Sequence, residues 1–287
     1  MKVEVLEPSG YCAGVEHAMD IAIKTKEQNP SKNVVVLGML VHNQDSLKEL
    51  EKHGIKTIYK QNCSYEQLID EINEPSIVVL TAHGHAKIVE EKLIKKGHTV
   101  VDATCPFVKQ SFVSILEAIS DNKEVLYIGV KNHPEAIAAL SLSKDVHLVN
   151  VKEPVIERGF NKSLLVISQT TLSRFEVEKI NEQIKVVYPN AEFLDGICNA
   201  STKRQEALMN LSKNVDLIYV VGGLNSNNSK TLFNLAKKLY PNTQVRLIQN
   251  AEDINKKDLS GFSHVVVSSG ASTPKEVINE IKNKLLN

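Results

Sequence analysis

The sequence predicts an α/β fold made of three similar units, each with a small, mainly parallel sheet flanked by helices. Two observations predict this fold. Cysteines recur at an equal step, because 105 − 12 and 198 − 105 are both 93, and a fixed period in one chain indicates repeated structural units. Within each period, short apolar runs typical of buried strands alternate with segments whose apolar residues recur every three or four positions. Strands that alternate with helices favour parallel sheets with right-handed crossovers.

The bulk composition is that of an ordinary globular protein. The 287 residues suffice for two or three small domains, and 42% of them are apolar while 24% are charged. Basic and acidic residues both number 34, so the net charge is zero and a nucleic-acid partner is disfavoured. No run approaches the ~20 apolar residues of a membrane helix, and the N-terminus has no signal-peptide pattern. We therefore expect a cytoplasmic protein without a membrane partner, whose cysteines are more often ligands or catalysts than disulfides.

The first period, residues 13–104, contains the elements of one complete unit. A helix is predicted directly after Cys12, from an apolar stripe at helical spacing. Ser46 and Glu49 have the spacing of a capping box at the start of a second helix, which stops at Gly54. The predicted strands of this unit are 33–38, 55–59, 76–80 and 99–102.

The second period, residues 105–197, repeats this order of elements. Pro106 suits the first turn of a helix, because proline lacks the N–H that this position would leave unpaired. A further apolar stripe at helical spacing predicts the helix that closes the unit. The predicted strands of this unit are 124–129, 146–149, 164–168 and 191–195.

The third period, residues 198–287, lacks its last strand. Its first helix is expected from about Thr202, and the residues from Thr273 to Glu276 combine a cap, a first-turn proline and a capping glutamate. The strand at the N-terminus has no partner in its own period, so we expect residues 1–12 to complete the third unit. The predicted strands of this unit are 1–6, 216–222, 245–248 and 264–268.

Three cysteines, Cys12, Cys105 and Cys198, each follow a predicted strand and open a predicted helix. Ligands of parallel α/β sheets bind outside the carboxyl ends of the strands, and a pseudo-threefold arrangement of the units would bring the three thiols to one point. Three thiolates suit zinc with a water, or an iron–sulfur cluster with one iron that lacks a protein ligand. No C-x-x-C spacing chooses between these metals. Cys63 lies at no repeat position and is expected to be a bystander.

Polar residues gather in the loops that follow the other predicted strands. Histidine, serine and asparagine near helix N-termini donate hydrogen bonds suited to a phosphate. Glu135 is the only carboxylate in this set, and a carboxylic acid that faces an anion site is a natural proton donor. His83 and His85 could form a metal pair, but the glycine between them breaks the regular strand, so we discount that pair. The set comprises His42, Asn43, His83, His85, His133, Glu135, Thr170, Thr171, Ser226, Asn227, Asn228 and Ser272.

Seven short motifs are specific enough to indicate a family. They are GYCAGV at 10–15, AHG at 82–84, DATCP at 102–106, HPE at 133–135, QTTLS at 169–173, IC at 197–198 and RQEA at 204–207. With these motifs in order over essentially its whole length, the chain closely resembles the 4-hydroxy-3-methylbut-2-enyl diphosphate reductases. These enzymes catalyse the last step of the non-mevalonate isoprenoid pathway, and their fold is a three-unit α/β arrangement about a central cluster.

The resemblance implies a cofactor, a reaction and a partner. It implies that Cys12, Cys105 and Cys198 hold one 4Fe–4S cluster, whose fourth iron binds the substrate hydroxyl. The implied reaction removes that hydroxyl with two electrons and two protons, giving isopentenyl and dimethylallyl diphosphates, and a reduced ferredoxin or flavodoxin supplies the electrons. The implied catalytic residues are Glu135, Thr170 and His133. The implied substrate-binding residues are His42, His83, His133, Thr170, Ser226, Asn227, Asn228 and Ser272.

Some positions depart from the family pattern. Asn227 stands where a second serine is usual, and Ser201 replaces a common threonine near the third cysteine. His85 replaces a usual apolar residue, and Gln44 and Asp45 stand where a more apolar pair is common. These departures concern the details of the diphosphate contacts and leave the expected reaction unchanged.

Two other function classes stay open on the residues alone. One is a cluster-based sensor that binds an anion without turnover, which Glu135 disfavours because such a sensor needs no acid. The other is a zinc hydrolase of phosphate esters. The colour of protein purified without oxygen separates them, because iron–sulfur protein is brown and zinc protein is colourless.

Overall fold

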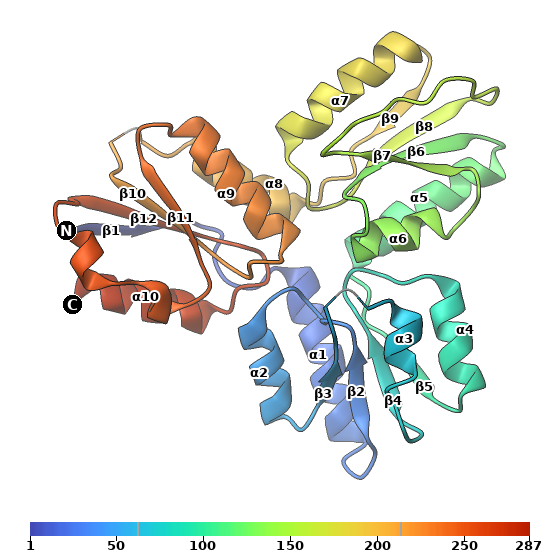
Figure 1. The fold of residues 1–287 in the computed structure, drawn as a ribbon, viewed down its shortest axis with the longest axis horizontal. Coiled ribbons are helices and arrows are strands. Elements are labelled where there is room, and N and C mark those ends of the chain that lie inside the picture. Colours follow the sequence, from blue (N-terminus) through green and yellow to red (C-terminus); the bar gives the residue numbers. More distant parts are fainter. Residues whose placement is uncertain (62, 213) are drawn as a thin grey trace. The chain divides into compact units, whose positions relative to one another are not determined.

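The computed structural model describes residues 1–61, 63–212 and 214–287. They form three four-stranded sheets in which every pair of neighbouring strands is parallel, with helices packed against the sheets (Figure 1). The predicted α/β class with three small parallel sheets is therefore confirmed. Contacts divide the chain into two compact units, which do not coincide with the three periods; the predicted boundaries at 104/105 and 197/198 stay a prediction. Unit 1 comprises Met1–Glu16, His42–Lys48 and Cys198–Asn287, and unit 2 comprises His17–Val41 and Glu49–Ile197.

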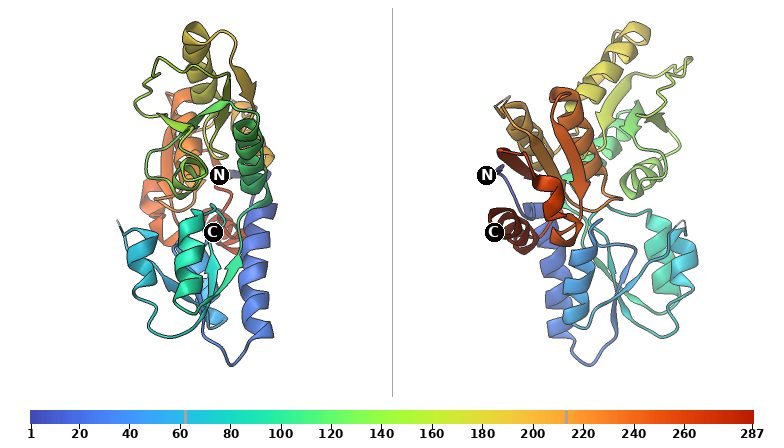
Figure 2. Two further views of the ribbon diagram at one scale, coloured as in Figure 1. Left: turned by 90° about the vertical axis from the view of Figure 1, so that its right-hand side faces the viewer. Right: turned by 60° about the vertical axis from the view of Figure 1, so that its left-hand side comes forward.

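Unit 1 contains one sheet with the strand order β1-β12-β10-β11. Helices α8 and α9 pack together, and α9 contacts β10 and β11, while α10 contacts β1 and β12. Figure 1 shows α9 and α10 on opposite faces of this sheet, and Figure 2 shows the same sheet from two further directions. The elements are β1 (Lys2–Val5), α8 (Asn199–Met209), β10 (Leu217–Val221), α9 (Asn227–Leu239), β11 (Gln244–Ile248), η1 (Ala251–Asp253), η2 (Lys256–Leu259), β12 (His264–Ser269) and α10 (Lys275–Leu286).

The N-terminal strand completes this sheet, as the sequence predicts. β1 pairs in parallel with β12, with Lys2 opposite His264 and Val5 opposite Val267. The pairing is driven by apolar burial, because Val3 and Val5 pack against the core cluster that α10 covers. Strands from the two ends of the chain are therefore neighbours in one sheet.

The first sheet of unit 2 has the strand order β3-β2-β4-β5. Its core cluster joins alternate residues of β2 and β4 to apolar residues of α3 and α4, among them Leu68 and Leu93. Helices α1 and α2 contribute residues to both units. The elements are α1 (Ala13–Gln28), β2 (Val34–Leu37), α2 (Gln44–Lys52), β3 (Lys56–Ile58), α3 (Tyr65–Ile69), β4 (Ile77–Leu80), α4 (Lys87–Lys95) and β5 (Thr99–Asp102).

The second sheet of unit 2 has the strand order β7-β6-β8-β9, and its two central strands are buried on both faces. Val125 and Tyr127 of β6 belong to the cluster covered by α5 and α6. Leu126 and Ile128 belong to the cluster covered by α7. A strand buried on both faces is apolar at every position, which is why the sequence shows it as a continuous run. The elements are α5 (Pro106–Ser120), β6 (Glu124–Gly129), α6 (Pro134–Leu140), β7 (Val146–Asn150), β8 (Leu164–Ser168), α7 (Arg174–Val187) and β9 (Glu192–Leu194).

The three sheets share one topology, which places the candidate residues at equivalent strand ends. In each, the first strand of the repeat pairs with both the second and the third, so the strand order reverses between the first and third strands. Ligands of parallel sheets bind at such reversals, outside the carboxyl ends of the strands. The loops after the first strands carry His42, His133 and Ser226, the loops after the third strands carry His83, Thr170 and Ser272, and the fourth strands lead to Cys12, Cys105 and Cys198.

Several predicted helix ends are wrong. Ser46 does not cap α2, because the Oδ1 of Asn43 accepts the backbone N–H groups of Asp45 and Ser46 at 2.8 and 3.4 Å. Pro274 is the N-cap of α10 rather than its first helical residue, and the Thr273 hydroxyl donates instead to the Val221 carbonyl at 2.9 Å.

Two further differences concern where helices begin. The predicted start near Thr202 is three residues late, since α8 begins at Asn199. Helix α3 was not predicted, although Ser64 and Gln67 form a complete capping box at its start. Across the residues that the structure describes, no helix has the length and apolar character needed to cross a lipid bilayer.

Candidate functional site

The most deeply buried carboxyl of the candidate set is that of Glu135, in the first turn of α6. Its side chain is 1% exposed. The backbone N–H of Thr170 donates to its Oε1 at 2.8 Å, and the Thr170 hydroxyl donates to its Oε2 at 2.9 Å. The hydroxyl of Tyr127, on β6, donates to Oε1 at 3.1 Å. The structure therefore brings together Glu135 and Thr170, two residues that lie 35 positions apart in the sequence.

The environment of Glu135 moves its proton equilibrium to neutral pH. Burial, which disfavours the charged form, raises the pKa of Glu135 from 4.5 to about 7, against the opposing effect of the hydrogen bonds from Thr170 and Tyr127. Burial also raises the pKa of Tyr127 well above its usual value, so its hydroxyl stays protonated. A carboxyl with a pKa near 7 holds a proton in a large fraction of molecules and can release it, as a general acid requires.

His133 lies beside Glu135 as the N-cap of α6. Its Nδ1 accepts the backbone N–H of Glu135 at 3.2 Å, so in the neutral ring the proton resides on Nε2. The ring of His83 packs edge-on against it, with centroids 5.4 Å apart and planes at 82°. The loop after β4 and the loop after β6 thus meet through two imidazoles.

A buried glutamine fixes the loop that carries Thr170. Gln169 is 0% exposed, its Oε1 accepts the backbone N–H of Val130 at 2.9 Å, and its Nε2 donates to the Thr171 hydroxyl at 3.1 Å. These bonds join the ends of the neighbouring strands β6 and β8. Gln169 therefore keeps Thr170 in reach of Glu135.

Cys105 caps the N-terminus of α5, with Pro106 in the first helical turn as predicted. Its backbone N–H donates to the Ala82 carbonyl at 3.0 Å, which joins the cysteine to the loop that carries His83. Asp102 shapes the approach to the helix, because its Oδ1 accepts the backbone N–H of Thr104 at 2.8 Å. The Asp102 carboxylate also pairs with Lys109 at 2.7 Å.

Cys12 and Cys198 of unit 1 lie at helix N-termini, as Cys105 does in unit 2. Cys12 directly precedes α1, and its backbone N–H donates to the Ala271 carbonyl at 2.9 Å. This contact repeats the one between Cys105 and Ala82, since each alanine directly precedes a candidate binding residue. Cys198 caps α8, and its Sγ lies 3.2 Å from the hydroxyl oxygen of Ser201.

The donor set fits a metal held by thiolates. All three cysteines are partly exposed and lie at helix N-termini, where the helix dipole favours a negatively charged sulfur. Cys63 has a different environment, since its side chain packs against the apolar core of the β2–β5 sheet. Its expected role as a bystander stays a prediction.

The polar loop residues of unit 1 are largely engaged with protein. Ser226 caps α9, and its Oγ accepts the backbone N–H of Ser229 at 3.3 Å. Asn228 is buried, its Oδ1 accepts the backbone N–H of Ala271 at 2.9 Å, and its Nδ2 donates to the Ser201 hydroxyl at 3.2 Å. Asn228 therefore links the loop after β12 to helix α8. Ser272 is also buried, and Asn227 is partly exposed.

His42 and Asn43 form the loop before α2. A Cβ added at Gly223 would lie 2.1 Å from the His42 carbonyl oxygen, so the His42 loop packs against the backbone after β10. Burial, assisted by the positive charge of Lys230, lowers the pKa of His42 to about 4. His42 is thus neutral at physiological pH, and its ring contributes hydrogen bonds rather than charge.

Residues 3–286 match the family model described as LytB protein. The chain belongs to the LytB family. A LytB relative from Malacoplasma penetrans, named 4-hydroxy-3-methylbut-2-enyl diphosphate reductase, is 36% identical over 288 residues, which cover 98% of this chain and 96% of the relative. Another from Alkaliphilus oremlandii has the same name and is 33% identical over 288 residues, covering 100% of both chains.

Solved structures give the same family relationship. The structure of E-1-hydroxy-2-methyl-but-2-enyl-4-diphosphate reductase from Plasmodium falciparum is similar with a TM-score of 0.88 and 28% identity, over 100% of this chain and 88% of that one. A structure of (E)-4-hydroxy-3-methyl-but-2-enyl diphosphate reductase, described as the terminal enzyme of the non-mevalonate pathway, has a TM-score of 0.66 at 27% identity. The three-sheet architecture is thus that of the LytB enzymes.

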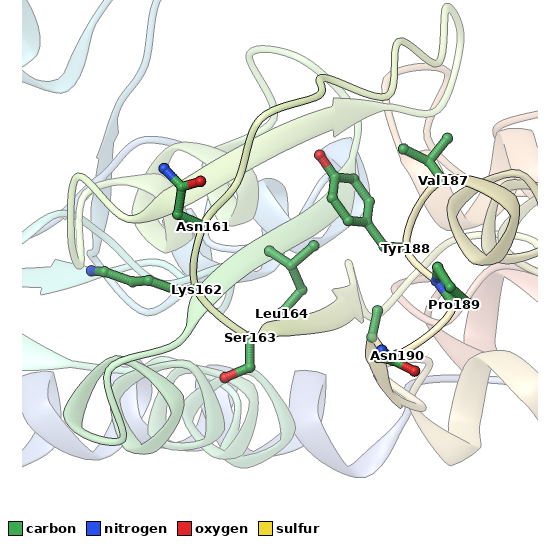
Figure 3. A pocket seen from close by; sticks show the side chains of 9 residues that line it. Asn161, Lys162, Ser163, Leu164, Val187, Tyr188, Pro189 and Asn190 are labelled. Carbon is green, nitrogen blue, oxygen red and sulfur yellow. The ribbon is translucent and has the colours of Figure 1, made fainter.

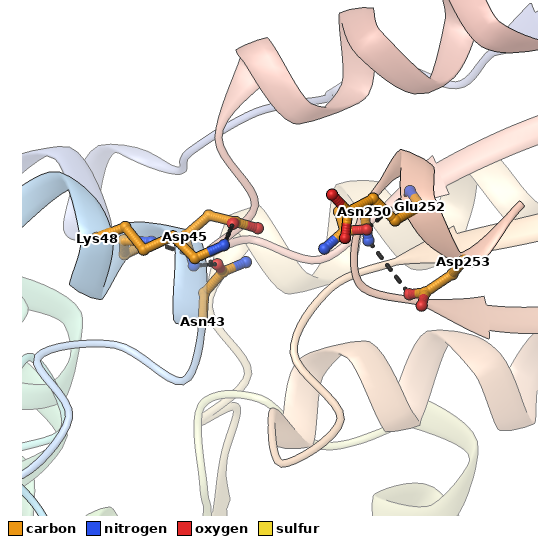
Figure 4. A network of polar contacts seen from close by, with 7 residues as sticks. Asn43, Asp45, Lys48, Asn250, Glu252 and Asp253 are labelled. Atoms are coloured by element: carbon orange, nitrogen blue, oxygen red, sulfur yellow. Dashed lines mark hydrogen bonds and ion pairs between the residues drawn. The ribbon is translucent and has the colours of Figure 1, made fainter.

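Two groups of polar contacts in unit 1 of this LytB chain lie at the start of α2 and after β11 (Figure 4). Besides the bonds of Asn43, Asp45 pairs with Lys48 at 3.1 Å. On the segment after β11, the Oδ1 of Asn250 accepts the backbone N–H of Glu252 at 2.9 Å, and Asp253 accepts that of Gln249 at 2.7 Å. These contacts cap local turns, so we assign them to structure rather than chemistry.

An open pocket of about 350 Å³ lies elsewhere in unit 2 (Figure 3). Leu164 begins β8 and Ala191 directly precedes β9, so the pocket lies at the amino ends of these strands. The candidate residues Thr170 and Glu135 lie at the opposite, carboxyl ends of the strands. Lys162 of the pocket is already paired with Asp145 at 2.6 Å. The pocket is therefore separate from the candidate site.

Sequence reasoning missed three buried polar side chains that hold candidate residues or the segments beside them. Tyr127 lies in an apolar strand and was read only as a core residue, although a buried tyrosine hydroxyl usually has a hydrogen-bond partner. Gln169 and Arg204 were noticed only as members of motifs, yet both are buried polar side chains. Their burial was the missing observation, because a polar group that leaves water needs partners, and those partners come from distant parts of the chain.

Proposed function

We propose that this LytB-family oxidoreductase removes the hydroxyl group of 4-hydroxy-3-methylbut-2-enyl diphosphate, the last step of the non-mevalonate isoprenoid pathway. The substrate takes up two electrons and two protons, the C–O bond to the hydroxyl breaks, and water leaves. The products are isopentenyl and dimethylallyl diphosphates. The names of the full-length relatives support this assignment.

The single observation that carries the proposal is the environment of Glu135. A fully buried carboxyl with a pKa of about 7 is suited to proton delivery, and it lies at the carboxyl end of a sheet, where ligands bind. The Glu135 carboxyl delivers one of the two protons that the reaction needs, and solvent supplies the other. Thr170 orients that carboxyl through its N–H and its hydroxyl, and His133, which adjoins it, completes the catalytic set.

We assign one 4Fe–4S cluster to Cys12, Cys105 and Cys198. Their partial exposure and their positions at helix N-termini support the assignment, as does the equal spacing in the sequence. When bound, such a cluster supplies the electrons and one iron without a protein ligand for the substrate hydroxyl. The protein contributes the three thiolates and the segments that hold them.

The diphosphate group is assigned to the polar loops at the strand ends. Serine and histidine caps at helix N-termini bind phosphate oxygens through side-chain and backbone donors. A neutral His42 can donate one N–H without competing for a proton. The assigned substrate-binding residues are His42, His83, His133, Thr170, Ser226, Asn227, Asn228 and Ser272.

The surroundings of the enzyme follow from its chemistry. A reductase that takes electrons one at a time through an iron–sulfur cluster needs a small reduced carrier, and we assign this role to a ferredoxin or flavodoxin. A reducing compartment keeps three ligand thiols from forming disulfides, so we place the protein in the cytoplasm.

We also assign the chain to three domains, 13–104, 105–197 and 198–287, the last completed by residues 1–12.

Iron analysis of cysteine variants tests the proposal. Protein purified without oxygen should be brown, and Cys12→Ser, Cys105→Ser and Cys198→Ser should each lose most of the iron, whereas the matched control Cys63→Ser should keep it. Wild-type protein with reduced carrier should convert the substrate to the two diphosphates, measured by NMR. Colourless protein that contains zinc, or iron lost from Cys63→Ser but kept in Cys105→Ser, would refute the assignment.

A further inference from the structure

Arg204, on the second turn of α8, is a buried cation that the proposed reaction does not use. Its side chain is 3% exposed. Its guanidinium donates to three backbone carbonyls: from Nη2 to Gly10 at 2.7 Å, from Nε to Ser269 at 3.2 Å, and from Nη1 to Ala200 at 3.2 Å. Burying a guanidinium costs several kcal/mol unless negative charge or dipoles compensate it, so its position calls for an explanation.

The three carbonyls belong to the segments that present the cysteines of unit 1. Gly10 lies two residues before Cys12, and Ala200 lies two residues after Cys198. Ser269 ends β12, and Ala271, which follows it closely, accepts the backbone N–H of Cys12. One planar side chain therefore connects both cysteine segments to one strand end. The fixed fork of arginine donors suits this task, which the single ammonium of lysine cannot match.

The charge of Arg204 acts on the same cysteines. Burial lowers the pKa of Arg204, while negative charge on Cys12, Cys198 and, to a lesser extent, Glu7 counteracts this effect. Glu7 is exposed. In the described residues the hydrogen-bond acceptors of Arg204 are neutral carbonyl oxygens, and the negative charges that act on its guanidinium include those of the two cysteines of unit 1.

We propose that Arg204 is a positioning residue for Cys12 and Cys198, and that its buried charge favours the reduced, more negative state of the cluster they hold. The inference rests on the proposed function for the presence of that cluster. Each one-electron reduction adds one negative charge near a cation that water screens poorly. Nearby charge and solvent exposure are among the factors that set the potentials of iron–sulfur clusters.

Two substitutions separate the charge from the hydrogen bonds. Arg204→Gln removes the charge, and we expect the equilibrium constant for one-electron reduction to fall about tenfold, which is about 59 mV in midpoint potential. Arg204→Lys keeps the charge but cannot make all three hydrogen bonds of the guanidinium. Its midpoint potential should stay near that of wild type, while a chelator should remove its iron faster. Lys203→Gln is the matched control, because it removes an exposed cation from the neighbouring position of the same helix.

Redox titration of the holoenzymes, followed by electron paramagnetic resonance, gives the midpoint potentials, and chelator challenge gives iron retention. A wild-type potential in Arg204→Gln with the control also unchanged would overturn the charge effect. Wild-type iron retention in Arg204→Lys would overturn the positioning effect. If Arg204→Gln does not fold, Arg204→Lys tests the charge effect instead. A tenfold fall in its equilibrium constant for one-electron reduction would overturn the charge effect, because lysine keeps the charge. Wild-type protein without a 4Fe–4S signal would instead refute the proposed function.

Discussion

At the scale of single residues, the proposed function assigns proton delivery to one buried carboxyl. Glu135 has little contact with water, and its donors come from β6 and from the loop after β8. Burial and hydrogen bonds act on its pKa in opposite directions, and burial dominates. Replacing Glu135 should therefore change kcat, and replacing one of its hydrogen-bond donors should change the pH dependence of kcat.

Glu135→Gln should lower kcat by about 10²–10⁴, because glutamine keeps the shape and an acceptor oxygen but has no acidic proton to release. Substrate affinity should stay within a few-fold. His42→Ala should show the opposite pattern, with weaker affinity and a smaller loss of kcat, because it removes a donor to the diphosphate. Substrate titration and single-turnover reduction without oxygen separate the two effects. Near-normal turnover by Glu135→Gln would show that another group delivers the proton.

Tyr127→Phe should move the pH dependence of kcat to higher pH. The Tyr127 hydroxyl donates to Oε1 and stabilises the ionised carboxylate, so its loss should raise the pKa of Glu135 above about 7. Because the protonated acid is the active form, the decline of kcat with rising pH should begin later. A pH–rate profile measures the shift. Tyr219→Phe, the same change in a buried tyrosine of β10, is the control and should leave the profile unmoved.

At the scale of helices and strands, apolar runs were predicted well and helix ends poorly. Strand runs such as 164–168 were recovered with their bounds because both faces of these strands are buried. Caps depend on which side chain reaches a free N–H, and several polar residues near each helix start were equally suitable. That is why Ser46 was chosen over Asn43, and why α3, with only five helical residues, was missed.

Asn43→Ala should destabilise the protein by about 1 kcal/mol, the usual cost of losing a side-chain N-cap. The Asn43 Oδ1 accepts N–H groups at the start of α2, and alanine has no acceptor there. Asn43→Asp keeps the acceptor and should retain most of the stability. Thermal unfolding of the three proteins measures the difference. Equal loss in both variants would mean that the cap does not determine the stability of this helix.

At the scale of the whole molecule, the equal cysteine spacing predicted one topology repeated in three sheets. The repeat also placed the candidate residues at strand ends, because every parallel strand of a sheet finishes at the same edge. The hydrogen-bond partners of Tyr127, Asn228 and Arg204 could not be predicted, since only folding brings these partners near. Sequence periodicity thus identifies the strand ends that carry the candidate residues, while the buried hydrogen bonds between segments depend on the folded structure.

Deleting residues 1–6 should make unit 1 sensitive to protease while the sheets of unit 2 stay resistant. The deletion leaves the backbone N–H and C=O groups on one side of β12 without partners and exposes the apolar surface that Val3 and Val5 cover. Limited proteolysis with mass spectrometry identifies the cleaved segments. Lys2→Ala, which changes an exposed side chain and keeps the backbone pairing, should digest like wild type. A truncated protein that digests like wild type would contradict this role of β1.

The pairing of β1 with β12 also determines when the sheet of unit 1 can form during synthesis. The two strands lie about 260 residues apart, and at a synthesis rate of about 5–20 residues per second the first waits about 10–50 s for the second to be made. During that interval the segment after β1 cannot dock, because the backbone N–H of Cys12 bonds to Ala271. Under the proposed function, Cys12 becomes an ordered ligand only after β12 and Ala271 have been made. The sheet of unit 1 must then form before all three cysteines can hold the cluster.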